Sequence, residues 1–66
     1  MNKPVMLKVT EAADYLGVSK GFLDKLRITG GGPEFYKIGA QVRYTPADLD
    51  AWLSERKRAS TSEYAA

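Results

Sequence analysis

The chain has 66 residues, a net charge of +2, and neither cysteine nor histidine. This length allows one domain, whose small core predicts a net stability of only about 3 to 5 kcal/mol. The missing cysteine and histidine exclude a disulfide, a thiolate metal site, an imidazole base and the usual nucleophilic triads. We therefore expect no enzyme, no catalytic residue, no metal site and no cofactor.

The chain also lacks membrane signals. No segment approaches the roughly 18 to 20 apolar residues of a membrane-spanning helix, and residues 1–7 lack the apolar core of a signal peptide. These features predict a cytoplasmic location without membrane contact.

Basic side chains are concentrated in the middle of the chain. Residues 20–44 carry five basic and two acidic side chains, a net charge of +3, whereas residues 1–19 are neutral and residues 45–66 carry −1. A local excess of this kind is expected of a protein that binds a polyanion.

A short helix is predicted to follow Thr10. A hydroxyl N-cap, an acidic residue in the first turn and a glycine at the end are typical of helices, and Thr10, Glu11 and Gly17 supply them. Helical spacing predicts that its buried side consists of Ala12, Ala13 and Leu16.

Ser19 is predicted to cap a second helix, from Lys20 to about Ile28. Three glycines and Pro33 must end it, because they favour neither a helix nor a strand. The apolar side chains at helical spacing are assigned to the core: Phe22, Leu23 and Leu26.

Residues 35–44 alternate between apolar and polar side chains around Gly39, which predicts a two-stranded hairpin. A three-residue loop ending at Gln41 is expected, since it places Tyr36, Ile38, Val42 and Tyr44 together on the inward face. In that register Lys37 lies directly opposite Arg43. Because like charges across a strand pair cost about 0.2 to 1 kcal/mol, we expect both cations to face the same phosphates.

Thr45 is expected to cap a third helix, with Pro46 at its first position and Asp48 at its third. Its core side is predicted to contain Leu49, Trp52 and Leu53. Residues 56–58 are basic and end this helix, which leaves residues 1–58 as the domain. Residues 59–66 are small and polar, and they are predicted to form a disordered tail.

The motifs of these elements resemble those of a known family. Ala13, Gly17, Leu23 and Leu26 stand at the spacing of helix-turn-helix proteins. The segments Glu11-Ala-Ala-x-x-Leu-Gly-Val-Ser19, Lys37-Ile-Gly39, Val42-Arg-Tyr44 and Asp48-Leu-x-x-Trp-Leu53 resemble the small phage and mobile-element excisionases and the AlpA-type regulators. This resemblance covers residues 7–54. It implies an α+β fold, a MerR-like winged helix-turn-helix of three short helices and a two-stranded antiparallel hairpin wing.

The resemblance also implies a bacterial or phage-encoded protein that binds double-stranded DNA. The second helix would enter the major groove, and the wing would lie against the neighbouring minor groove or backbone. The implied contacts from the second helix are Ser19, Lys20, Gly21, Asp24, Lys25 and Arg27, and those from the wing are Lys37, Gln41 and Arg43. The wing tip has Ala40-Gln41 where many relatives have Arg-Arg, so contact is expected from the strands more than from the tip.

Some of these residues also have a structural interpretation. Ser19 is first a helix cap, and Arg27 can pair with Asp24 along the same helix, although exposed pairs of this kind contribute only about 0.3 to 0.5 kcal/mol. Lys20 and Lys25 can equally belong to a solvated helix face.

Three functions are compatible with the sequence. The first is an excisionase, a recombination directionality factor that binds attachment-site DNA cooperatively, side by side with further copies, bends it and assists a tyrosine integrase in excision. The second is an AlpA-like transcriptional regulator. The third is a protein-interaction module without DNA binding.

Overall fold

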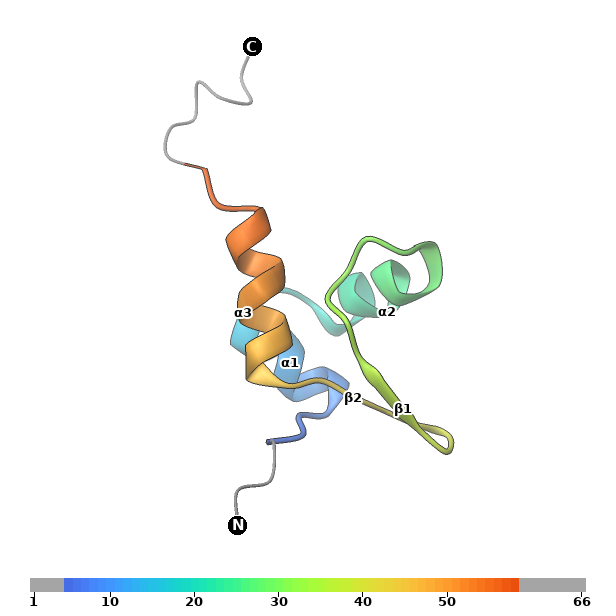
Figure 1. The fold of residues 1–66 in the computed structure, drawn as a ribbon. Helices are drawn as coiled ribbons and strands as arrows, with labels where there is room; N and C mark the ends of the chain where they lie inside the picture. Colours follow the sequence, from blue (N-terminus) through green and yellow to red (C-terminus); the bar gives the residue numbers. More distant parts are fainter. Residues whose placement is uncertain (1–4, 59–66) are drawn as a thin grey trace.

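The computed structural model describes residues 5–58, which form three helices and one antiparallel hairpin (Figure 1). The predicted α+β fold is therefore confirmed, while the predicted tail, residues 59–66, lies outside the described residues. No helix within residues 5–58 is both long enough and apolar enough to cross a membrane. The elements in chain order are α1 (Val9–Leu16), α2 (Lys20–Thr29), β1 (Tyr36–Ile38), β2 (Gln41–Arg43) and α3 (Pro46–Glu55).

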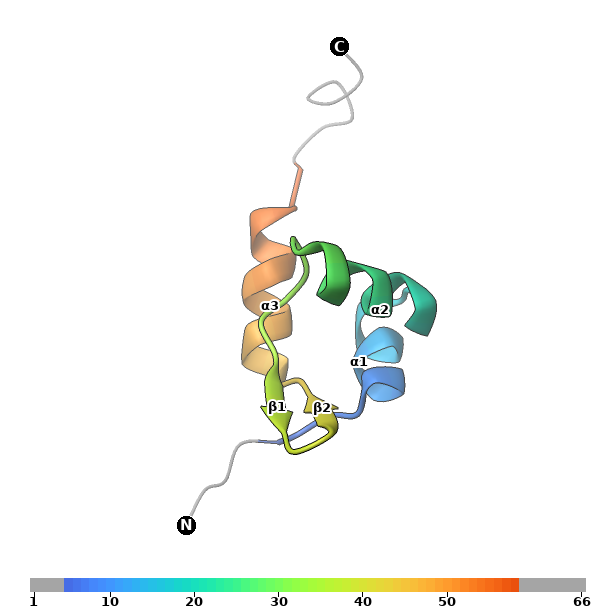
Figure 2. The ribbon, with the colours of Figure 1, turned by 90° about the vertical axis from the view of Figure 1, so that its right-hand side faces the viewer.

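The core lies where the three helices meet the base of the hairpin (Figure 2). A hydrogen bond of 2.7 Å from the Tyr15 hydroxyl to Asp50 Oδ1 ties α1 to α3. At the hairpin base, Leu7 and Tyr44 exchange backbone hydrogen bonds of 2.7 and 2.9 Å, so the segment before α1 lies beside β2. The buried residues of the hydrophobic core cluster are Ala12, Ala13, Leu23, Tyr44 and Leu49.

Two residues predicted to be in the core are exposed. Phe22 is 44% and Leu53 is 40% accessible, so their assignment to the core is wrong. Each helix of so small a domain packs along one narrow side, and Leu23 and Leu49 already occupy those positions. Trp52 is half-buried, and its indole Nε1 donates to the carbonyl oxygen of Gly31 at 2.8 Å.

The predicted N-cap of α1 is also wrong. The helix begins at Val9, and Lys8 is its N-cap. The Lys8 backbone N–H donates to Glu11 Oε1 at 2.8 Å, as in a capping box, so the glutamate determines where the helix starts and Thr10 lies inside it. The predicted end is confirmed, because Gly17 adopts a left-handed φ of 73° and the next N–H bonds back to Ala13.

The caps of the other two helices are confirmed. Ser19 Oγ accepts the N–H of Phe22 at 3.1 Å at the start of α2. Thr45 Oγ1 accepts the N–H of Asp48 at 3.3 Å, with Pro46 opening α3. These caps depend on side chains within three residues of each other, which is why a local sequence pattern predicts them.

The predicted register of the hairpin is wrong by one residue. Ile38 pairs with Gln41, and Lys37 pairs with Val42, which leaves a two-residue loop. Gly39 has a φ of 62°, whereas no other kind of residue within 5–58 has a positive φ. A glycine in the first loop position suits a tight two-residue turn of the type that matches strand twist.

This register changes which residues share a face, because strand side chains alternate. Val42 and Tyr44 lie on the inward face, but Tyr36 and Ile38 point outward and are 46% and 55% exposed. Lys37 and Arg43 are therefore not opposite each other and lie on different faces of the hairpin. The predicted repulsion between the two cations is therefore absent, and the expectation that both face the same phosphates is wrong.

Candidate nucleic-acid interface

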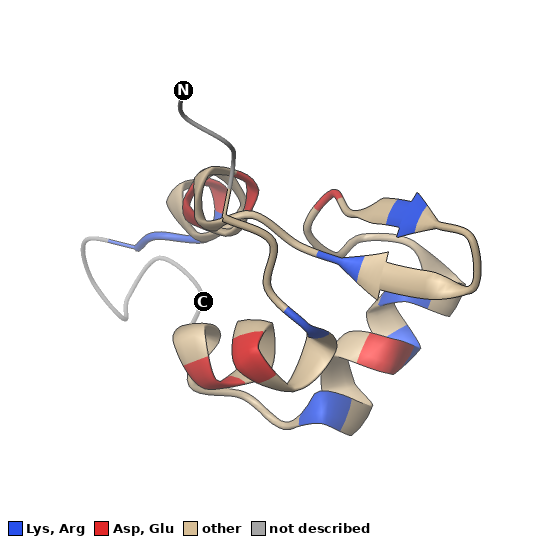
Figure 3. Ribbon diagram, turned by 90° about the horizontal axis from the view of Figure 1, so that it is seen from below, with Lys and Arg blue, Asp and Glu red and all other residues tan. Residues whose placement is uncertain are grey.

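A basic groove lies between the start of α1, one flank of α2 and the hairpin. Its volume is about 350 Å³. Figure 3 shows basic positions on both strands and on α2 beside them, whereas acidic positions gather mainly on α1 and α3. We call this site the basic groove; its lining residues are Lys8, Val9, Thr10, Lys20, Asp24, Arg27, Ala40, Gln41, Val42 and Arg43.

Asp24 holds two cations on the α2 side of the groove. Its Oδ2 accepts from Lys20 Nζ at 2.6 Å, and its Oδ1 accepts from Arg27 Nη2 at 2.9 Å. The hydrogen bond from Lys20, and then that from Arg27, lowers the pKa of the Asp24 carboxyl below its ordinary value. The intrahelical pairing of Arg27 with Asp24 is therefore present.

The hairpin side of the groove carries Arg43 and Gln41. Arg43 Nη2 donates to Gln41 Oε1 at 2.7 Å, and Nη1 donates to the carbonyl oxygen of Val42 at 2.8 Å. These contacts hold the guanidinium along β2, with its charge uncompensated by any carboxylate among residues 5–58.

The outer face of α2 forms a separate stripe. Gly21, Lys25 and Ile28 follow one another at spacings of four and three, on the side away from Leu23 and Leu26. Ile28 is 84% exposed, and a Cβ added to Gly21 would meet open space. This stripe presents a small residue, a cation and an apolar side chain on one accessible surface.

The structure thus brings together five of the residues that the sequence singles out. Lys20, Asp24, Arg27, Gln41 and Arg43 line the basic groove. The remaining four lie outside the lining: Ser19 at the α2 cap, Gly21 and Lys25 on the outer stripe, and Lys37 on the other face of the hairpin.

Sequence reasoning missed Lys8 and Thr10 as groove residues. Both reach the groove because the Leu7–Tyr44 bridge places the start of α1 beside β2. This pairing joins segments that are far apart in the chain, and no local pattern signals it.

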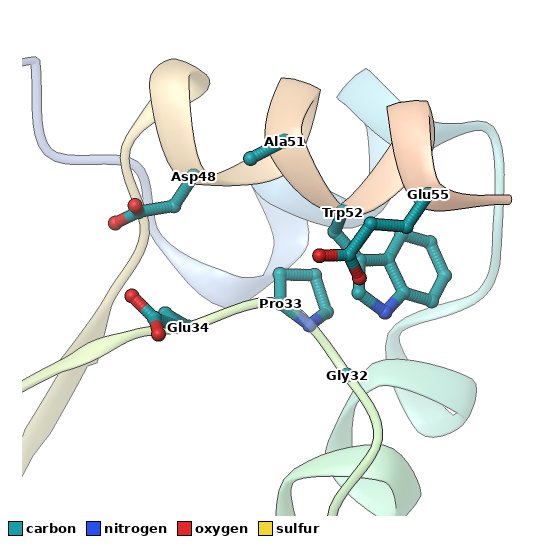
Figure 4. Close-up of a pocket in the computed structure, with 7 residues that line it drawn as sticks. All are labelled: Gly32, Pro33, Glu34, Asp48, Ala51, Trp52 and Glu55. Atoms are coloured by element: carbon teal, nitrogen blue, oxygen red, sulfur yellow. The ribbon is translucent and has the colours of Figure 1, made fainter.

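A second hollow, of about 290 Å³, lies on the α3 side (Figure 4). Pro33, Ala51 and Trp52 form its walls, and Glu34, Asp48 and Glu55 present carboxylates around it. The negative charge of this hollow opposes a phosphate backbone, so the basic groove is the candidate interface.

Two helices joined by a tight turn, followed by a two-stranded hairpin and a closing helix, define a helix-turn-helix domain with a wing. The comparison of sequences agrees with this class: the chain belongs to the helix-turn-helix domain family, which matches residues 6–57. A search of curated proteins found no matching sequence.

Proposed function

We propose that this protein binds double-stranded DNA with α2 and the hairpin, as an accessory factor of the excisionase type. The observation that carries the proposal is the basic groove, which is lined by Lys8 at the N-cap of α1, Lys20 of α2 and Arg43 of β2. Phosphate contacts from several elements fix the orientation of a protein on a duplex. The AlpA-like regulator is the alternative, since it would use the same surface.

The proposed major-groove contact is the outer stripe of α2. A second helix of a helix-turn-helix reads base edges with the residues near its N-terminus. Gly21 and Lys25 lie in the first two turns of α2, and Lys25 suits a guanine edge. Gly21 leaves room for the backbone to come close to the duplex. Ser19 and Lys20 lie at the helix N-terminus, where backbone N–H groups favour phosphate.

The hairpin is proposed to lie against the adjacent minor groove. Lys37 and Arg43 point to opposite faces of the ribbon, and a minor groove has a phosphate strand on each side. The two cations can therefore contact different strands of the backbone, and Gln41 lies next to the turn on the same face as Arg43.

Support for the excisionase role comes from the resemblance of the motifs in residues 7–54. A single module of this size buries only about 600 to 1,000 Å² on DNA, so we expect several copies to bind side by side. Bending of attachment-site DNA and assistance to a tyrosine integrase belong to the same proposal.

Salt dependence provides the first test. If about four phosphates are neutralised, the logarithm of the association constant for duplex DNA should fall against the logarithm of salt concentration with a slope near −4. Lys20→Gln, Lys37→Gln and Arg43→Gln should each make this slope shallower by about 1. Fluorescence anisotropy with a labelled duplex measures the slopes.

Lys57→Gln is the matched control, because Lys57 is exposed after the end of α3 and outside the basic groove. It should leave the slope unchanged. A flat salt response of the unmodified protein would instead favour the protein-interaction module.

Cooperativity provides the second test. On attachment-site DNA, rising protein concentrations should produce a ladder of increasingly retarded complexes in a gel-shift experiment. PCR across the empty attachment site should show more excision with the protein than without it. A single 1:1 complex and unchanged excision would contradict the excisionase role, and binding at a promoter would then favour the regulator.

A further inference from the structure

Arg27 connects α2 with the base of the hairpin. Its Nη2 donates to Asp24 Oδ1 at 2.9 Å, and its Nη1 donates to the Tyr44 hydroxyl at 3.4 Å. Its guanidinium carbon also lies 6.0 Å from the centre of the Phe35 ring. Phe35 precedes β1 and Tyr44 follows β2, so one side chain contacts the residues that flank both strands at the base of the hairpin.

We propose that Arg27 is a positioning residue that fixes the direction of the hairpin relative to α2, and that it does not itself bind phosphate. This inference rests on the proposed DNA-binding function. The Arg27 side chain is only 22% exposed, and two of its nitrogens already have partners. These two bonds orient the guanidinium toward Asp24 and Tyr44, and its low exposure limits the surface open to a phosphate.

Tyr44 gives the contact its importance. Tyr44 is only 1% exposed, and the centre of its ring lies 6.1 Å from the centre of the Phe35 ring. A buried hydroxyl requires a hydrogen-bond partner, and Arg27 is the partner found for it among residues 5–58. The planar guanidinium can donate to Asp24 and Tyr44 at once, which the single ammonium of lysine cannot do in the same geometry.

The hairpin needs such a contact to have a defined direction. Its two strands have three residues each, and an isolated two-stranded hairpin is only marginally stable. The Leu7–Tyr44 bridge and the Arg27 contacts both act at its base. If α2 and the hairpin contact DNA together, a fixed angle between them reduces the conformational entropy that is lost on binding and therefore strengthens binding.

Arg27→Lys and Tyr44→Phe test the proposal, since the first keeps the charge and the second keeps the ring. In the free protein, both should reduce the residual dipolar couplings of the Tyr36–Arg43 amides, while those of α2 and α3 keep their values. Both should weaken DNA binding by about threefold to tenfold, as expected for the loss of one hydrogen bond. Circular dichroism establishes that each variant is folded at the temperature used.

A double-mutant cycle separates positioning from contact with phosphate. If Arg27 positions the hairpin, Arg43→Gln should cost less affinity in the Tyr44→Phe background than in the unmodified protein. The inference would be overturned if Arg27→Lys and Tyr44→Phe left the hairpin couplings unchanged and the affinity losses of Tyr44→Phe and Arg43→Gln were additive. The single variant Arg27→Gln would then make the salt slope shallower by about 1, as a phosphate contact does. Because the couplings are measured without DNA, they decide the role of Arg27 even if the proposed function fails.

Discussion

Replacing Leu49 with alanine is expected to destabilise the domain by about 2 to 5 kcal/mol. Leu49 is completely buried, and it packs with Leu23 and Tyr44 in the core. A domain of this size has only about 3 to 5 kcal/mol of net stability. Most Leu49→Ala molecules should therefore be unfolded at 25 °C, and duplex binding should be lost with the fold. Urea titration followed by circular dichroism measures the effect.

Leu53→Ala is the control, because it removes the same atoms from the same helix. Leu53 is 40% exposed, so its truncation leaves little cavity and should cost about 1 kcal/mol or less. The burial pattern indicates that the core depends on Leu49 and not on Leu53. Equal urea midpoints for the two variants would contradict this.

Gly32→Ala is expected to destabilise the protein by about 1 to 3 kcal/mol, a cost typical of overpacking. A Cβ at position 32 would lie 2.8 Å from the Cβ of Leu26. The loop cannot shift freely, because the indole Nε1 of Trp52 and Arg56 Nη2 each donate to the neighbouring Gly31 carbonyl at 2.8 Å. Thermal unfolding followed by Trp52 fluorescence measures the loss. A Gly32→Ala variant as stable as the unmodified protein would contradict the close packing of the loop against α2.

Gly21→Ala should have the opposite effect on stability. Gly21 lies within α2, and a Cβ there would meet open space, so alanine should stabilise the helix by about 0.5 to 1 kcal/mol. If Gly21 allows close approach to DNA, this more stable variant should bind the duplex more weakly.

The elements that the sequence predicts well are those controlled by neighbouring residues. Ser19, Thr45 and Gly17 act within one helical turn of the groups they bond, so the limits of α2 and α3 and the end of α1 follow from local patterns. The start of α1 is the exception. Thr10 and the capping box closed by Glu11 both offer a local signal there, and the capping box prevails.

The register of the hairpin could not be derived in the same way. Burial of Tyr36 and Ile38 requires a core on that side, and the hairpin extends away from α3 instead (Figure 1). With no core to cover those side chains, the backbone preference of Gly39 for a tight turn decides the loop length. The one-residue difference moves Lys37 and Arg43 to opposite faces.

The sequence by itself determined the class of fold, the helix-turn-helix spacing and the basic middle third of the chain. These properties depend on composition and on contacts within a few residues. Tertiary structure alone decided that Lys8 joins the groove, that Phe22 stays exposed and that Arg27 reaches Tyr44. Such contacts join distant parts of the chain, and their geometry depends on how the helices pack around Leu23 and Leu49.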